Sequence, residues 1–177
     1  MIINKTKLNS FISNKVINRQ KSLFENDLNS NNLILSKKLK KKKVLVIGGA
    51  GTIGANYIKC LLKFDISELI VIDINENGLV ELIRTLRSSS LYKIPKVLKT
   101  YAIDFGDKIF IKYFKENGPY DFVVNFAAHK HVRNEKDIFS IHAMINNNIL
   151  KNRNLLNILS DYTPINFFCV STPCPAA

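Results

Sequence analysis

Short apolar runs alternate along residues 43–170 with segments whose apolar residues are spaced three or four apart. The runs are typical of strands buried on both faces of a parallel sheet, and the spaced segments are typical of amphipathic helices. This alternation predicts an α/β fold of the Rossmann type, a doubly wound parallel sheet with right-handed crossovers. The predicted strands are Val44–Ile47, Leu69–Ile72, Leu98–Ile103, Phe122–Phe126 and Phe167–Val170.

Positive charge is concentrated ahead of the first predicted strand. The chain has a net charge of +12, but residues 1–43 hold 11 Lys and Arg against Glu25 and Asp27 only. We therefore expect residues 1–42 to form a basic, partly helical extension and residues 43–177 to form the nearly neutral folded domain. The lysine run ahead of the first strand, residues 37–43, is expected to be a solvated lead-in, so no nucleic-acid partner is predicted. A basic arm that binds phosphates is the alternative.

Composition excludes several other classes of protein. No run approaches the roughly 18 apolar residues of a membrane span, so no integral membrane segment is expected. The three cysteines, Cys60, Cys169 and Cys174, show no CxxC spacing, which argues against a disulfide framework and a structural zinc site. The expected location is the reducing cytoplasm.

A glycine-rich turn joins the first predicted strand to the following helix. Its glycines have the spacing GxxGxxG, which allows a tight turn, a close approach to a pyrophosphate and close packing of the helix. The helix N-terminus supplies free N–H groups to the same anion. The predicted pyrophosphate-binding residues are Gly48, Gly51, Thr52, Ile53 and Gly54.

Asp73 ends the second predicted strand, 19 residues after Gly54. A carboxylate at this place accepts hydrogen bonds from the adenosine ribose and repels a 2′-phosphate, so the predicted cofactor is NAD or NADP, with NAD favoured. In the alternative interpretation, Asp73 caps the helix that begins near Asn75.

Two further strand ends carry candidate residues. Asp104 follows the third strand, where it either accepts the adenine amino group or caps the helix before Lys108. Ala127 and Ala128 follow the fourth strand, where small residues leave room for the ribose and the nicotinamide.

Directly after these alanines come His129, Lys130 and His131, at the edge of the sheet where ligands bind. Contact with an anionic substrate or cofactor, an exposed loop and a metal site are the three interpretations. Because zinc requires at least a third ligand, no metal is predicted.

The motifs VLVIGGAGTIG, VIDINENGL, NFAAHKHV and VST, together with Asn148 in a predicted helix, resemble one branch of the extended short-chain dehydrogenases. That branch is the CapD-like polysaccharide-biosynthesis group, which includes UDP-N-acetylglucosamine 4,6-dehydratases and related 4-epimerases. The resemblance covers about Lys43 to Thr172. It implies a nicotinamide cofactor that oxidises a sugar at C4, elimination of water across C5 and C6, and return of hydride to C6.

The resemblance also implies roles for individual residues. Gly48, Gly51 and Gly54 would hold the pyrophosphate, Asp73 the ribose and Asp104 the adenine. The remaining residues implied are Ala127, Ala128 and Lys130 along the cofactor, His131 and Asn148 in support of the active site, and Thr172, with Ser171, in the catalytic motif.

Some residues depart from the family pattern. Ile47 replaces a frequent threonine, and Lys151 replaces a common glycine beyond Asn148. Relatives continue with Ser-Thr-Asp-Lys and a later Tyr-x-x-x-Lys pair, whereas this chain ends in STPCPAA. We therefore expect a sheet truncated after the fifth strand and a chain that is inactive by itself.

The resulting hypothesis is the NAD(P)-binding portion of a nucleotide-sugar 4,6-dehydratase whose substrate is a UDP-sugar. A UDP-sugar 4-epimerase and a non-catalytic dinucleotide-binding module are the alternatives. The resemblance also allows a homo-oligomer.

Overall fold

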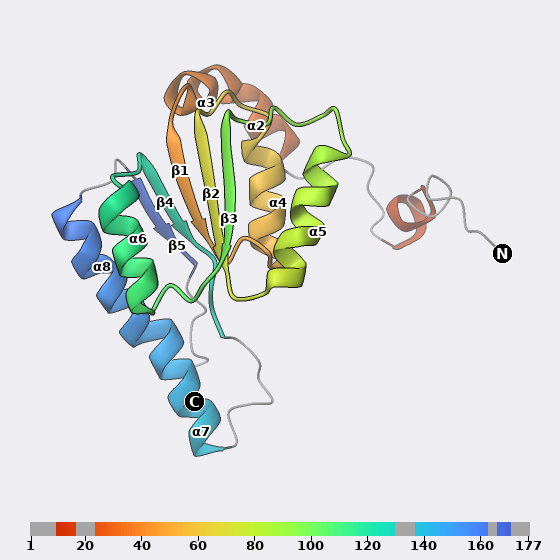
Figure 1. Cartoon of the computed structure of the whole chain (residues 1–177). Coiled ribbons are helices and arrows are strands. Elements are labelled where there is room, and N and C mark those ends of the chain that lie inside the picture. Colours follow the sequence, from red (N-terminus) through yellow and green to blue (C-terminus); the bar gives the residue numbers. More distant parts are fainter. Residues whose placement is uncertain (1–9, 17–23, 130–136, 163–165, 171–177) are drawn as a thin grey trace. The chain divides into compact units, whose positions relative to one another are not determined.

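The computed structural model describes residues 10–16, 24–129, 137–162 and 166–170 (Figure 1). The chain divides into two compact units, Met1–Lys37 and Lys38–Ala177. The first unit contains a short π-helix, η1 (Ile12–Val16), and α2 (Glu25–Ser30), and neither helix has a buried residue. A third helix, α3 (Asn32–Leu39), spans the boundary in the sequence.

The second unit is built on a five-stranded parallel sheet with the strand order β3-β2-β1-β4-β5. This order confirms the predicted Rossmann-type fold, because the chain winds outward from β1 in one direction and then from β4 in the other. The strands are β1 (Lys43–Ile47), β2 (Glu68–Asp73), β3 (Val97–Ala102), β4 (Phe122–Asn125) and β5 (Asn166–Cys169).

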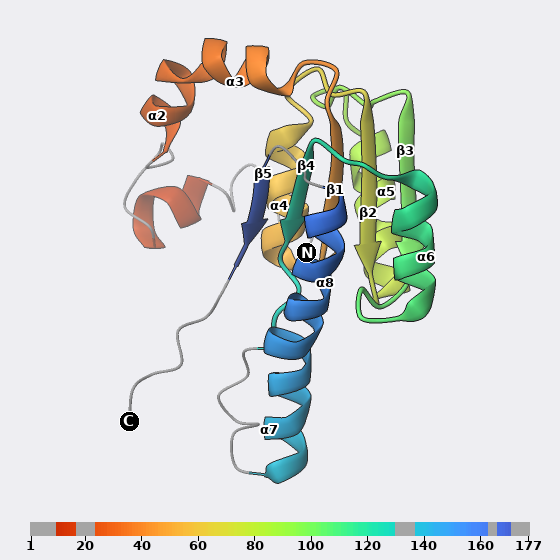
Figure 2. The ribbon, with the colours of Figure 1, turned by 90° about the vertical axis from the view of Figure 1, so that its left-hand side faces the viewer.

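Helices cover both faces of this sheet. Figure 1 shows α4 and α5 on one face and α6 and α8 on the other. The helix after β4 bears a π-helical segment, η3, between α7 and α8, and Figure 2 shows α7 extending past the carboxyl edge of the sheet. The bounds are α4 (Thr52–Leu61), α5 (Glu76–Arg87), α6 (Lys108–Asn117), α7 (Ile138–Ile145), η3 (Asn146–Leu150) and α8 (Lys151–Asp161).

The core forms two layers because successive side chains of a strand point to opposite faces. Val44 and Val46 of β1 pack in the cluster beneath α4 and α5, whereas Leu45 and Ile47 pack in the cluster beneath α6 and α8. All four are at most 1% exposed. Burial of each such side chain stabilises the fold by about 1.5–3 kcal/mol, which explains the continuous apolar runs in the sequence.

Lys42 and Lys43, the last lysines of the basic run, are both bonded to Asp121 within the second unit. The Lys42 ammonium lies 2.8 Å from Asp121 Oδ1, and the Lys43 N–H donates to Asp121 Oδ2 at 2.8 Å. Burial disfavours the charged form of Asp121, but these donors outweigh it and hold the pKa of this carboxyl below its usual range. The expected solvated lead-in is therefore wrong for Lys42.

Candidate functional site

The glycine turn packs at backbone contact distance against the end of β4. Gly48 has φ +74°, a conformation that favours glycine, and a Cβ added there would lie 2.5 Å from the Ala127 nitrogen. Gly54, inside α4, faces the turn itself, since its added Cβ would lie 2.8 Å from the Gly49 Cα. The turn, the helix and the β4 exit are thus held together by the absence of side chains.

The N-terminus of α4 offers free backbone donors. Gly51 is the N-cap residue, is exposed, and makes no side-chain cap hydrogen bond. The first turn of α4 holds no acidic residue. Thr52 and Ile53, which begin the helix, are also exposed. The unpaired N–H groups and the positive end of the helix dipole are suited to bind an anion.

Asp73 lies at the carboxyl end of β2 and is bonded to the glycine turn. Its Oδ2 accepts the Ala50 N–H at 2.9 Å, and its Oδ1 accepts the Asn75 N–H at 2.9 Å. The cap of α5 is Asn75, whose side chain accepts the Gly78 N–H, so the interpretation of Asp73 as the helix cap is wrong. Each carboxylate oxygen has a second lone pair that can accept a ligand hydroxyl.

Asp104, after β3, lies in an ion pair that joins two distant parts of the sequence. Its Oδ1 accepts the Gly106 N–H at 2.8 Å, and its Oδ2 accepts the Lys151 ammonium of α8. Burial disfavours the carboxylate, but the hydrogen bonds from Lys151 and Gly106 prevail and lower the pKa of Asp104. The alternative of a helix cap is wrong, because Asp107 is the N-cap residue of α6.

Asn148 fixes the backbone that leaves β4. Its Oδ1 accepts the His129 N–H at 2.8 Å, and its Nδ2 donates to the His129 carbonyl at 2.8 Å. One amide therefore pairs with both backbone groups of His129, as a neighbouring strand would. Asn148 lies in η3, and π-helical turns of this kind occur frequently at functional sites.

Two asparagines, Asn125 and Asn152, tie β4 to α8. Asn125 is fully buried; its Nδ2 donates to Asn152 Oδ1 at 2.7 Å, and its Oδ1 accepts the Ala127 N–H at 2.9 Å. Asn152 in turn donates to the Asn148 carbonyl at 3.0 Å. The network holds the β4 exit and the π-helical segment in one arrangement.

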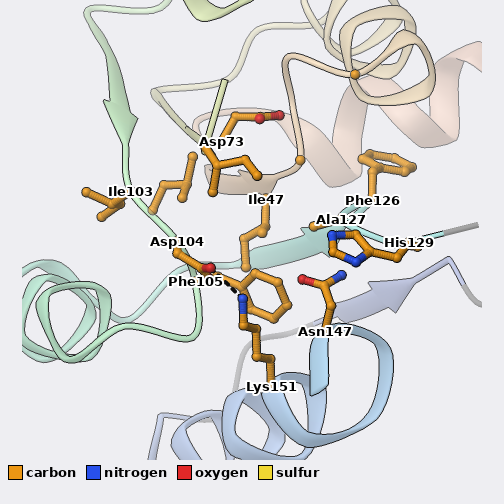
Figure 3. A pocket seen from close by; sticks show the side chains of 15 residues that line it. Ile47, Asp73, Ile103, Asp104, Phe105, Phe126, Ala127, His129, Asn147 and Lys151 are labelled. Carbon is orange, nitrogen blue, oxygen red and sulfur yellow. Dashed lines mark hydrogen bonds and ion pairs between the residues drawn. The ribbon is translucent and has the colours of Figure 1, made fainter. Parts of the chain in front are cut away.

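These elements enclose a cavity of about 310 Å³ at the carboxyl edge of the sheet (Figure 3). This is the edge, at the point where the strand order reverses between β1 and β4, at which ligands bind in doubly wound sheets. The predicted residues that line the cavity are Gly48, Gly51, Asp73, Asp104, Ala127 and Ala128.

The other predicted residues lie elsewhere. Gly54 packs behind the glycine turn, and Asn148 acts on His129, which itself lines the cavity. Lys130, His131 and Thr172 lie outside the described residues, as does Ser171.

Sequence reasoning missed four polar residues of the site. Asn147 is 7% exposed and lines the cavity together with Lys151, while Asn125 and Asn152 hold its wall. The sequence signal that could have found them is a polar residue at a position of a helix or strand that is expected to face the sheet. Lys151, which replaces a common glycine, is the clearest example.

The described ranges contain neither a cluster of metal ligands nor a helix suited to span a membrane. No three His, Cys, Asp or Glu side chains there come together as metal ligands. Among the helices formed by those ranges, none has the length and apolar composition of a membrane span.

Two curated relatives match about three quarters of the chain. An uncharacterized membrane protein of Methanocaldococcus jannaschii is 32% identical over 133 residues, which are 75% of this chain and 37% of the relative. The capsular polysaccharide biosynthesis protein CapD of Staphylococcus aureus is 28% identical over 139 residues, 78% of this chain and 22% of the relative. The chain thus spans little more than a third of the first relative's length and less than a quarter of the second's.

A solved structure shares the fold. The Bordetella bronchiseptica enzyme WbmF, crystallised in complex with NAD+, superimposes with a TM-score of 0.54 at 22% identity, covering 71% of this chain and 34% of WbmF. The family model described as polysaccharide biosynthesis protein matches residues 44–174. Since this match covers most of the chain, the chain belongs to the polysaccharide biosynthesis protein family.

Proposed function

We propose that the second unit binds a nicotinamide dinucleotide, as the cofactor-binding portion of a nucleotide-sugar 4,6-dehydratase that acts in polysaccharide biosynthesis. The observation that carries the proposal is the glycine turn, whose close packing leaves the uncapped N-terminus of α4 beside the cavity. Backbone donors in this arrangement bind a pyrophosphate without any side chain.

The residues present fit the rest of the dinucleotide. Asp73 lies two strands from the β4 exit and retains lone pairs for the ribose hydroxyls. Its negative charge opposes a 2′-phosphate, which favours NAD over NADP. On the other side of the switch point, Ala127 and Ala128 leave space beside His129 for the second ribose and the nicotinamide. When bound, the nicotinamide would supply hydride transfer; the residues described here bind and orient it.

The comparisons support this proposal in two ways. The chain shares a family with proteins of polysaccharide biosynthesis, and WbmF, which has the same fold, binds NAD+. A UDP-sugar substrate and a homo-oligomer are further parts of the proposal that rest on the sequence resemblance, and a cytoplasmic location is a further part that rests on the cysteine pattern.

Two other functions remain alternatives. A UDP-sugar 4-epimerase would use the same cofactor site. The product that the whole protein forms from a UDP-sugar would distinguish the epimerase from the dehydratase. A non-catalytic dinucleotide-binding module would use the same cofactor site, and dinucleotide binding without turnover by the whole protein would identify it. We also propose that this chain alone binds the dinucleotide without turnover.

The test is isothermal titration of the chain with NAD and NADP. Gly51→Asp places a carboxylate at the pyrophosphate position, and its Cβ would meet only the Gly48 carbonyl oxygen at an ordinary 3.5 Å, so this variant keeps the fold. We expect it to weaken NAD binding at least tenfold, while Asp73→Asn narrows the preference for NAD over NADP. Asp161→Asn, at the far end of α8, is the matched control.

Two results would overturn the proposal. One is a chain, shown to be folded by circular dichroism, that binds neither dinucleotide. The other is NAD binding that Gly51→Asp leaves unchanged.

A further inference from the structure

The strand order fixes where the base of a bound dinucleotide would lie. The glycine turn follows β1, Asp73 ends β2, and Asp104 follows the next strand, β3. If the pyrophosphate binds at the turn and the ribose at Asp73, the base extends to Asp104. This inference therefore rests on the proposed function and concerns the end of the cavity that receives the base.

Asp104 is a weaker acceptor than an isolated carboxylate would be. Both of its oxygens already have donors, the Gly106 N–H and the Lys151 ammonium. The 6-amino group of adenine is also a hydrogen-bond donor, so it would have to share an oxygen with the ammonium and lie beside a positive charge.

Lys151 is held so that its ammonium lies at the cavity wall. Its aliphatic carbons lie against Gly106, where an added Cβ would come within 2.7 Å of them. The ammonium lies 5.8 Å from the centre of the Phe105 ring, and Figure 3 shows it directed toward Asp104. The side chain is 18% exposed. It is a fixed part of the wall rather than a solvated lysine.

The ammonium retains donors for a ligand. A lysine ammonium has three N–H donors, and among the described residues Asp104 is its one hydrogen-bond acceptor. An acceptor atom on the base would therefore receive a charged hydrogen bond, whereas a donor would not.

We propose that Lys151 determines the base preference of the cavity, so that a purine with a 6-oxo group binds at least as tightly as one with a 6-amino group. The carbonyl oxygen of a 6-oxo purine accepts a charged hydrogen bond from the Lys151 ammonium, a contact that the 6-amino group of adenine, which is a donor, cannot make. Adenine offers the opposite arrangement, a donor at C6 and an acceptor at N1.

The test compares NAD with nicotinamide hypoxanthine dinucleotide, which differ at C6 and N1 of the purine. Dissociation constants of both are measured by isothermal titration for the native chain and for Lys151→Met, whose side chain keeps the stem on Gly106 without the charge. The readout is the ratio of the NAD constant to the hypoxanthine constant, because the pyrophosphate and ribose contacts cancel in it.

We expect a ratio of one or more for the native chain. In Lys151→Met we expect the ratio to fall roughly tenfold or more. The hypoxanthine dinucleotide loses one charged hydrogen bond, and the Asp104 oxygen that Lys151 occupied becomes free to accept from adenine. Lys151→Gln keeps an uncharged donor, so we expect its ratio to lie between those of the native chain and Lys151→Met. This variant replaces Lys151→Met if the methionine variant does not fold. Lys115→Met, an exposed lysine of α6, leaves the ratio unchanged.

The outcomes separate this inference from the proposed function. Binding of both dinucleotides with a native ratio below one, or with the same ratio in Lys151→Met, overturns the role of Lys151 and leaves the dinucleotide site intact. Binding of neither dinucleotide by any folded variant overturns both.

Discussion

Replacing Asn125 by alanine tests whether the asparagine network holds the carboxyl edge of the sheet. The side chain is fully buried, donates to Asn152 at 2.7 Å and accepts from the Ala127 N–H at 2.9 Å. Truncation removes both bonds and leaves the Asn152 oxygen and the Ala127 N–H without these partners. Because each polar group left unsatisfied costs about 1–3 kcal/mol, the two groups together predict a loss of about 2–6 kcal/mol in the free energy of unfolding.

Urea unfolding followed by circular dichroism measures this loss, and a double-mutant cycle assigns it. Asn152→Ala and the Asn125→Ala/Asn152→Ala pair complete the cycle, with an expected coupling of about 1 kcal/mol between the two amides. Asn154→Ala, an exposed position on the same helix, should change stability by less than about 0.5 kcal/mol.

Either of two results would show that the asparagine network does not hold this edge of the sheet. Asn125→Ala could cost less than about 1 kcal/mol, which would mean that water satisfies the groups left behind. The two substitutions could instead be additive within about 0.3 kcal/mol, which would mean that the amides do not depend on each other.

Two further substitutions test the core and the anchoring of the basic run. Leu155→Ala, at 1% exposure, should cost about 2–5 kcal/mol in urea unfolding, whereas the neighbouring Leu156→Ala, at 50% exposure, should cost far less; equal losses would contradict the two-layer core. The folded pKa of Asp121 is lowered, so its pairing with Lys42 stabilises the fold above the unfolded pKa and this contribution disappears as pH falls through the folded pKa. The stability difference between the native chain and Asp121→Asn should therefore be constant near neutral pH and shrink below about pH 4, and a difference independent of pH would refute the pairing.

Local patterns were sufficient to predict the frame of the fold. Apolar runs located all five strands, with each predicted end within one residue of the observed end. The glycine turn was also predictable, because its function depends on a strand before it and a helix after it. These features depend on neighbours in the sequence, so the sequence alone carries them.

The site's polar contacts were not predictable in the same way. The Asp104 and Lys151 side chains are 47 residues apart in the sequence, and Lys42 and Asp121 are 79 residues apart. No periodicity relates such residues, and only the folded sheet brings them together. From the sequence alone, an aspartate after a strand is expected to cap the next helix or to bind a ligand, and nothing near Asp104 in the sequence indicates its partner on α8.

The helix after β4 shows how this information could be recovered from a sequence. Asn147, Lys151, Leu155 and Leu159 follow one another at intervals of four and so lie along one stripe. The two leucines of this stripe are buried against the sheet, whereas Asn147 and Lys151 line the cavity. Where a helical stripe changes from apolar to polar residues, the apolar half therefore packs in the core and the polar half lies at a ligand site. Helical periodicity relates the two buried leucines, and the same interval of four extended by two steps toward the N-terminus from Leu155 reaches Lys151 and Asn147 at the site.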